Sequence, residues 1–187
     1  VQVRLAGLGK HNAVNAAGAL AAASALGVPP DKAAPSLSTH FVPAHHRLEV
    51  QRAASGAVIL DDCYNANPMS TKAALDTLSA IAEGESGAVL GSMLELGPTA
   101  DDLHREIGRY AGEVGVSWLA ATGPHAEALA AGAREAGVET VLVTEDAMTV
   151  AGEVSAFATD GRWLLLKGSR GGRLERLLTT LGVEEVE

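Results

Sequence analysis

Short apolar runs alternate with longer amphipathic segments through most of this 187-residue chain. Each run suits a strand buried on both faces, and each intervening segment places apolar residues at helical spacing. Parallel strands need such crossover helices, so the alternation predicts an α/β fold: a Rossmann-like, mostly parallel sheet with helices on both faces. The predicted strands are residues 57–60, 88–90, 118–121, 140–143 and 163–166, and the predicted helices are residues 69–82, 100–114, 124–136, 146–157 and 173–181.

The first part of the chain follows a different pattern. Residues 13–26 form an alanine-rich segment that ends at glycine and proline, which predicts a helix with a sharp stop. A second, short helix is expected over residues 31–37, and residues 41–46 lack periodicity and are predicted to be a linker. A hairpin made by residues 48–50 and 57–60 then leads into the alternating units. We therefore predict two parts: the end of another domain over residues 1–45, and the α/β domain over 46–187.

Composition excludes several classes of protein. A net charge of −9 and an isoelectric point near 5.1 argue against nucleic-acid binding through a broad basic surface, although a local site for phosphates stays compatible. The single cysteine, Cys63, excludes an internal disulfide framework and a multi-cysteine metal site. No uninterrupted apolar run of about 18 residues occurs, so no membrane span is expected. A reducing, cytoplasmic setting fits this cysteine usage.

Polar side chains are concentrated between the first predicted strand of the alternating units and the helix that follows. Residues 61–68 read Asp-Asp-Cys-Tyr-Asn-Ala-Asn-Pro. Ligands of open α/β sheets bind where strands end, and the N–H groups of a helix start suit anions. A plain turn with Pro68 opening the helix is the simpler interpretation. The density of carboxylates, carboxamides and a phenol favours a functional site.

Two further segments occupy equivalent places after strands. Residues 167–172, Lys-Gly-Ser-Arg-Gly-Gly, precede the last predicted helix and are compatible with an anion cradle at a helix N-terminus. Residues 91–97 form a glycine-bounded turn, in which Glu95 could face a ligand, and His104 follows in the next helix. The alternative for this second segment is a structural loop with a histidine on the helix surface.

Two positions nearer the N-terminus could also contact a ligand. Asn12 and Asn15 are three residues apart and therefore share a helix face, and carboxamides can read a purine edge because they donate and accept. The alternative is that Asn12 caps the helix. Arg47 opens the α/β domain, and its guanidinium suits phosphate or ribose oxygens, whereas the alternative is a solvated surface arginine.

The nucleotide-binding motifs of two other protein classes are missing. No Walker A loop is present, and no Gly-x-Gly-x-x-Gly follows a strand; residues 7–10 resemble one only superficially. A nucleotide-dependent oxidoreductase on the same fold is therefore disfavoured. A non-catalytic α/β domain that binds a peptide or a nucleotide remains an alternative.

Taken together, the ordered motifs resemble those of the Mur ligases, the ATP-dependent amide ligases of peptidoglycan precursor synthesis. Residues 64–68, Tyr-Asn-Ala-Asn-Pro, have the form typical of the member that joins D-Ala-D-Ala to UDP-N-acetylmuramoyl-tripeptide. A related ligase of the folyl or polyglutamate type is the alternative within this chemistry. The other motifs that carry the resemblance are His11-Asn12 with Asn15, Arg47-Leu48-Glu49, residues 90–97 with His104, and Lys167-Gly168-Ser169-Arg170.

The resemblance implies a role for each candidate residue. These ligases have three domains, and this chain would hold the end of the central ATPase domain and the whole C-terminal domain. Asp62 and Lys167 would be the catalytic residues. The residues that would contact ATP are Asn12 and Asn15 at the adenine and Arg47 and Asp62 at the ribose and phosphates; those that would line the dipeptide and γ-phosphate side are Tyr64, Asn65, Asn67, Lys167, Ser169 and Arg170.

The resemblance also implies the reaction and its cofactors. ATP would phosphorylate the tripeptide carboxylate, and the amine of D-Ala-D-Ala would attack the acyl phosphate. The Gly-x-x-Gly-Lys-Thr loop and the Mg²⁺ ligands of the central domain are absent, and the chain begins at Val1 without an initiator methionine. We therefore expect a monomeric fragment with no metal ligand of its own that is inactive alone. Ser92 stands where the family commonly has Asp, and His46 where it commonly has Gly.

Overall fold

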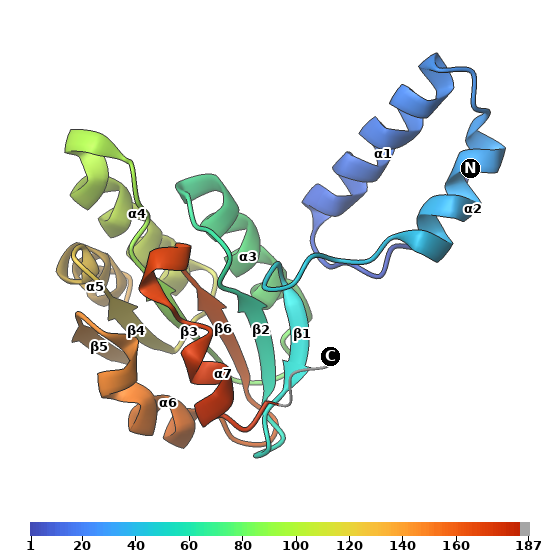
Figure 1. The fold of residues 1–187 in the computed structure, drawn as a ribbon. Helices are drawn as coiled ribbons and strands as arrows, with labels where there is room; N and C mark the ends of the chain where they lie inside the picture. The colour runs from blue at the N-terminus through green and yellow to red at the C-terminus, as the bar shows by residue number, and fades with distance from the viewer. Residues whose placement is uncertain (184–187) are drawn as a thin grey trace.

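A computed structural model describes residues 1–183 and contains the predicted α/β fold (Figure 1). The sheet has the strand order β1-β2-β6-β3-β4-β5, and only the edge strand β1 runs antiparallel to its neighbour. The hairpin of β1 and β2 is therefore confirmed. The strands are β1 (Glu49–Arg52), β2 (Val58–Asp62), β3 (Ser86–Gly91), β4 (Trp118–Thr122), β5 (Thr140–Thr144) and β6 (Trp163–Lys167).

Helices cover both faces of this sheet, as the alternation predicts. Successive strand residues point to opposite faces, so Leu90 joins one core and its neighbour Val89 the other. The first core lies under α3 (Pro68–Ile81), α4 (Ala100–Glu113) and α5 (Ala126–Glu135), and the second lies under α6 (Ala151–Phe157) and α7 (Arg176–Thr180).

Two glycines allow α4 and α5 to cross at very short range. A Cβ atom on Gly108 would lie 1.8 Å from the carbonyl oxygen of Leu129, and one on Gly132 would lie 1.9 Å from that of Arg105. Both distances are far below van der Waals contact, and both opposing atoms belong to the backbone. Only glycine fits at either position.

The N-terminal part forms a pair of helices that projects from the α/β part (Figure 1). α1 (Lys10–Ala25) and α2 (Pro30–His40) begin earlier than predicted but confirm both helices. No residue of α1 is buried, and Ala34 is the one buried residue of α2. The connection from α2 to β1 contains neither helix nor strand, as expected for a linker.

Two predicted helices differ from the structure in their first turns. The segment expected as a helix from residue 146 opens with a 3₁₀ turn, η2 (Ala147–Val150), before α6; another such turn, η1 (Gly97–Thr99), precedes α4. The last helix was expected from residue 173, directly after the glycine-rich loop. Instead η3 (Arg170–Gly172) is followed by Arg173 at φ 51°, a left-handed conformation that interrupts the helix.

Leu174 gives the physical reason for this last difference. Its side chain is buried against the loop, and a Cβ on Gly168 would lie 2.8 Å from Leu174 Cδ1. Anchoring Leu174 there delays the start of α7 to residue 176. The prediction that residues 167–172 open directly onto a helix N-terminus is therefore wrong. Within residues 1–183 no helix is long and apolar enough to cross a membrane.

Candidate active site

The carboxyl ends of β2, β6 and β3 lie side by side at one edge of the sheet. In the strand register Lys167 of β6 lies opposite Asp62 of β2 on one side and Leu90 of β3 on the other. The segments 61–68, 91–97 and 167–172, which lie far apart in the sequence, therefore converge at this edge. Most of the residues that sequence analysis assigned to a site lie together at this edge.

An ion pair between Lys167 and Asp62 forms the centre of these residues. We call them the Lys167 cluster; its members are Asp62, Tyr64, Asn65, Lys167, Ser169 and Arg170. The Nζ of Lys167 lies 2.8 Å from Oδ2 of Asp62 and donates a hydrogen bond of 2.7 Å to the carbonyl oxygen of Asn65. The lysine is only 2% exposed. Burial raises the pKa of Asp62, and this outweighs the opposing effects of the Lys167 charge and the Leu48 N–H.

Tyr64 lies beside two guanidinium groups. The Cζ of Arg47 is 4.3 Å from the centroid of the tyrosine ring, and that of Arg170 is 5.9 Å away. Both arginines are exposed, and neither forms an ion pair with a described carboxylate. Two cations held together by an aromatic ring are suited to bind phosphate or carboxylate oxygens.

Ser169 contributes an unused polar group. It is 5% exposed, and its Oγ has no hydrogen-bond partner among residues 1–183. Buried hydroxyls are nearly always paired, so an unpaired one at a strand end is a candidate ligand contact. It lies two residues after Lys167, on the same loop as Arg170.

The two asparagines of the Tyr64–Pro68 segment have structural bonds of their own. Asn67 caps α3, because its Oδ1 accepts from Ser70 N at 2.8 Å while its own N–H donates to Ser70 Oγ at 3.1 Å. Asn65 Oδ1 accepts from Ala66 N at 2.8 Å. The simpler interpretation of this segment as a helix-opening turn is therefore also correct. Both asparagines are exposed and retain free donors.

The structure does not join Asn12 and Asn15 to this cluster by any contact within the described residues. Both lie on α1, where Asn15 is exposed and Asn12 Nδ2 donates to Leu8 O at 2.7 Å. The N-cap of α1 is Gly9, so Asn12 is not the cap. A cavity of about 270 Å³ separates the start of α1 from α3; it is lined by Leu8, Gly9, Lys10, His11, Ala73, Asp76, Thr77, Ala80 and Ile81.

Comparison with known proteins identifies the family to which this arrangement belongs. Residues 46–170 match the family described as "Mur ligase, glutamate ligase domain". The chain belongs to the Mur ligase family. The UDP-N-acetylmuramoyl-tripeptide–D-alanyl-D-alanine ligase of Bacillus subtilis is 35% identical over 176 residues, which cover 93% of this chain and 38% of the relative. The ligase of the same name from Mycobacterium tuberculosis H37Rv is 39% identical over 127 residues, covering 65% and 25% respectively.

One solved structure agrees with this family assignment, and a second has the same fold. A crystal structure of MurF from Acinetobacter baumannii superposes with a TM-score of 0.84 at 30% identity, covering 96% of this chain and 39% of that one. MurF ligase from Thermotoga maritima in complex with ADP has the same fold, with a TM-score of 0.78 at 24% identity and coverage of 96% and 40%. This Mur ligase chain thus spans about two fifths of the length of the Bacillus subtilis relative and of both solved structures, and a quarter of the Mycobacterium tuberculosis relative.

One residue of the Mur ligase chain has a structural role that its sequence pattern did not reveal. His104 is fully buried, so the alternative of a histidine on the helix surface is wrong. Its Nε2 accepts from Met93 N at 2.8 Å and its Nδ1 donates to Ala100 O at 2.6 Å, which requires the neutral ring. The ring stacks on His125, with centroids 4.6 Å apart. His104 therefore holds the loop after β3 in place.

Ser92, at the position where the family commonly has Asp, also ties this loop down. Its Oγ accepts from His125 N at 3.1 Å and donates to Thr122 O at 3.2 Å. Ser92 is buried and joins the ends of β3 and β4. In this structure it is a structural residue beside the Lys167 cluster.

Unfolding should depend on pH through His104. Burial, with the nearby His125, lowers the pKa of His104, so the unfolded chain binds this proton more tightly than the folded chain. The stabilising contribution of the neutral ring is therefore full above the ordinary histidine pKa of about 6.5 and is lost as the pH falls. Urea unfolding at pH 7 and pH 5 should show a smaller pH effect in His104→Gln than in the wild type. An equal pH effect in both proteins would refute this.

Cys63 and the described carboxylates offer no metal site. Cys63 is buried, and burial raises the pKa of its thiol, as expected for a small buried residue rather than a nucleophile. Within residues 1–183 no group of three or more His, Cys, Asp or Glu residues could hold a metal ion.

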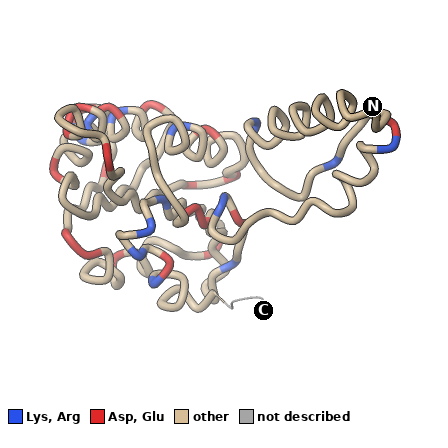
Figure 2. The backbone as a smooth tube through the Cα atoms, turned by 45° about the horizontal axis from the view of Figure 1, so that its top comes forward, with Lys and Arg blue, Asp and Glu red and all other residues tan. Residues whose placement is uncertain are grey.

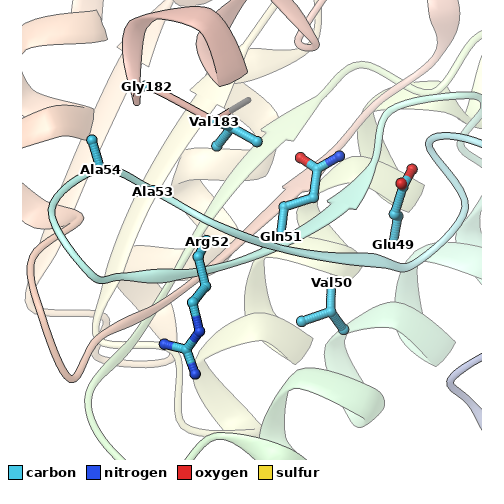
Figure 3. Close-up of a pocket in the computed structure, with 8 residues that line it drawn as sticks. All are labelled: Glu49, Val50, Gln51, Arg52, Ala53, Ala54, Gly182 and Val183. Carbon is cyan, nitrogen blue, oxygen red and sulfur yellow. The ribbon is translucent and has the colours of Figure 1, made fainter. Parts of the chain in front are cut away.

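A groove of about 480 Å³ follows the edge strand β1 (Figure 3). In Figure 3 Gln51 points toward Val183, whereas Val50 and Arg52 project to the opposite side of the strand. The groove contains none of the residues assigned to the site. Its lining residues are Glu49, Val50, Gln51, Arg52, Ala53, Ala54, Gly182 and Val183.

Proposed function

We propose that this chain is the C-terminal part of an ATP-dependent amide ligase that joins D-Ala-D-Ala to UDP-N-acetylmuramoyl-tripeptide. Residues 1–45 would end the central ATP-binding domain, and residues 46–187 would form the C-terminal domain. The observation that carries the proposal is the buried Lys167–Asp62 pair beside Tyr64 and its two arginines. The Bacillus subtilis relative, whose name states this activity, supports the choice of substrates.

In the proposed reaction the γ-phosphoryl group of ATP moves to the tripeptide carboxylate, which gives an acyl phosphate and ADP. The amine of D-Ala-D-Ala then attacks the acyl carbon, and the tetrahedral intermediate expels inorganic phosphate as the amide forms. Negative charge gathers on oxygens in both steps, so the protein must supply cations and N–H donors where those oxygens lie.

Lys167 is suited to this task. An ammonium has three donors; one is directed at Asp62 and one at Asn65 O, which leaves one N–H for a ligand oxygen. Asp62 balances the charge of the lysine inside the protein, so the cation can remain buried next to the reacting groups. These two bonds also fix the direction of the remaining N–H.

The surrounding residues divide into two groups in the proposal. Arg47 would bind the ribose and phosphates of ATP, since its guanidinium is exposed at the mouth of the cluster. Arg170 and the unpaired hydroxyl of Ser169 would serve the dipeptide and γ-phosphate side. Tyr64, Asn65 and Asn67 would line the dipeptide, using the donors that their structural bonds leave free.

ATP and Mg²⁺ differ in how well the described residues fit them. For ATP, Asn12 and Asn15 offer carboxamides to adenine, although one Asn12 donor is already bonded to Leu8. For Mg²⁺ the described residues do not fit, because Asp62 is paired with Lys167 and no other acidic cluster is suitable. The proposal therefore assigns Mg²⁺ to protein segments outside this chain.

The proposal includes a cytoplasmic location, a monomeric state and no activity of the 187-residue chain alone. Closure of the missing domains onto this edge would exclude water that could hydrolyse the acyl phosphate.

The N-terminal helices carry few charged residues, as the mostly tan tube in Figure 2 shows, and α1 has no charged residue after Lys10. This surface is compatible with contact to further protein.

The test is phosphate release by the longer protein that contains this chain. With UDP-N-acetylmuramoyl-tripeptide and MgATP, release should require D-Ala-D-Ala, and Asn65→Ala should raise the KM for the dipeptide roughly tenfold through lost hydrogen bonds. Gln51→Ala, which changes the separate β1 groove, is the matched control and should behave as wild type. The 187-residue chain alone should release no ADP.

Other outcomes would assign a different activity. Phosphate release that depends on glutamate with a folyl acceptor would indicate a ligase of the folyl or polyglutamate type. Thermal stabilisation by D-Ala-D-Ala without any turnover in the longer protein would indicate a non-catalytic binding domain. Either result would overturn the proposed ligation.

A further inference from the structure

The backbone on both sides of Arg47 is held in an unusual conformation. His46 has φ 58° and Leu48 has φ 51°, both in the left-handed region that non-glycine residues seldom adopt. Such residues persist only where their surroundings hold them, and they cluster at functional sites. Arg47 thus lies between two residues in the left-handed conformation, in the linker between α2 and β1.

Three hydrogen bonds hold residue 46 in this conformation. The ring Nδ1 of His46 lies 2.6 Å from Oδ2 of Asp61. The backbone N–H of His46 donates to Glu49 Oε2 at 3.2 Å, and its carbonyl oxygen accepts from Tyr64 N at 3.1 Å. The linker is therefore attached to the start of β1, to the end of β2 and to the segment that carries Tyr64.

The bond to Asp61 differs from the other two because it satisfies a buried charge. Asp61 is 0% exposed, and its Oδ1 accepts from Cys63 N at 3.2 Å. Its neighbour Asp62 points to the opposite face of the sheet and is paired with Lys167. Among residues 1–183 the cationic partner of Asp61 is His46 alone. A buried carboxylate without a partner would be costly.

The groups around His46 favour its protonated form. Burial lowers the pKa of His46, but the hydrogen bond and charge of Asp61 outweigh it, with help from Glu175 and Glu49, so the pKa is raised. Asp61 belongs to β2, Glu49 to β1, and Glu175 precedes α7. The adjacent His45 is exposed and lies 3.6 Å from Glu49.

We propose that His46 is a positioning residue: by binding buried Asp61, its ring holds the linker so that Arg47 stays over Tyr64 at the mouth of the site. This inference rests on the proposed function and adds a residue to it. His46 does not touch the substrates in this account; it acts through Arg47. Loss of its ring should therefore weaken ATP binding while leaving the chemical step nearly unchanged.

The contact itself is tested on the 187-residue chain by NMR titration of the histidine rings. The His46 midpoint should lie above the ordinary value of about 6.5 and should fall when Asp61→Asn removes the charge. His45 serves as the internal reference, since it does not contact Asp61. A His46 midpoint that Asp61→Asn leaves in place would overturn the inference.

The positioning role is tested by kinetics of the longer protein. His46→Gly suits the left-handed backbone but lacks the ring, and His46→Asn tolerates the same backbone but carries no charge. Both should raise the KM for ATP roughly tenfold, the effect of losing a hydrogen bond to a charged group, and change kcat less than about twofold. The matched control is His45→Asn, which should leave both constants unchanged.

A pH profile separates positioning from general destabilisation. In the wild type the KM for ATP should rise as the pH is raised through the titration midpoint of His46, because the ring then loses its charge and releases Asp61. In His46→Gly this pH-dependent step should be absent. If His46→Gly and His46→Asn both keep the wild-type KM for ATP and show normal circular dichroism, the inference about His46 is overturned and the proposed function is not. No ligation by the wild type would instead overturn the proposed function, while the titration would still report the His46–Asp61 contact.

Discussion

Lys167→Met is expected to destabilise the 187-residue chain by about 3–5 kcal/mol, because it leaves the carboxylate of Asp62 buried without its cation. Methionine matches the length of the lysine stem, so the loss comes from the charge rather than from a cavity. The hydrogen bond to Asn65 O is lost as well. Urea unfolding followed by circular dichroism at pH 7 measures this difference.

The control for this prediction is the double variant Asp62→Leu with Lys167→Met. Removing both charges leaves no unpaired group, so the double variant should recover most of the lost stability. The raised pKa of Asp62 offers a second check, since protonating the carboxyl at low pH should narrow the gap between Lys167→Met and the wild type. A double variant no more stable than Lys167→Met would show that the pair is not the cause.

The same substitution should remove activity from the longer protein if the proposed function is correct. We expect Lys167→Met to lower kcat by about 10²- to 10³-fold, the usual effect of removing one donor that stabilises transition-state charge. The double variant should stay inactive although its stability recovers. Recovery of activity in the double variant would limit Lys167 to a structural role.

Gly132→Ala is the second substitution with a large expected effect. Its Cβ would lie 1.9 Å from the carbonyl oxygen of Arg105, and the opposing atom is backbone that no side-chain rotation can remove. The α4–α5 crossing must therefore open, and we expect a loss of about 3 kcal/mol or more in the free energy of unfolding. Thermal and urea unfolding of the 187-residue chain measure it.

Gly152→Ala is the matched control for that experiment. Gly152 lies in α6, and a Cβ there would meet nothing within 4 Å. Alanine should stabilise this helix by roughly 0.5–1 kcal/mol because it restricts the unfolded chain. Equal effects of the two substitutions would mean that the short approach of α4 and α5 is not maintained in solution.

The sequence predicts the strands and helices well because buried parallel strands are uniformly apolar. It does not predict that β6 lies between β2 and β3, since chain order does not determine strand order in a sheet. The contact of Lys167 with Asp62 depends on that insertion. The sequence also does not predict the late start of α7. Leu174 is held by a tertiary contact, and local helix propensity does not encode such contacts.

The candidate site, too, is predicted by the sequence in part. Its location at the ends of β2 and β6 follows from the polar density of residues 61–68 and 167–170. From the sequence alone, a structural role of Asn67 or His104 cannot be distinguished from a ligand-binding role, because the same side chain suits both roles. Asn65, Asn67, Ser169 and Arg170 remain predicted ligand contacts, as do Asn12, Asn15 and Arg47.

β1 runs against the other five strands, and this direction has a mechanical consequence. Glu49, at the start of β1, lies opposite Asp61 near the end of β2, so the linker enters the sheet at the edge where the site lies. The segment that joins α2 to the sheet is therefore also the segment that carries Arg47 (Figure 1). A change in how α2 lies relative to β1 would act directly on Arg47, beside the Lys167 cluster.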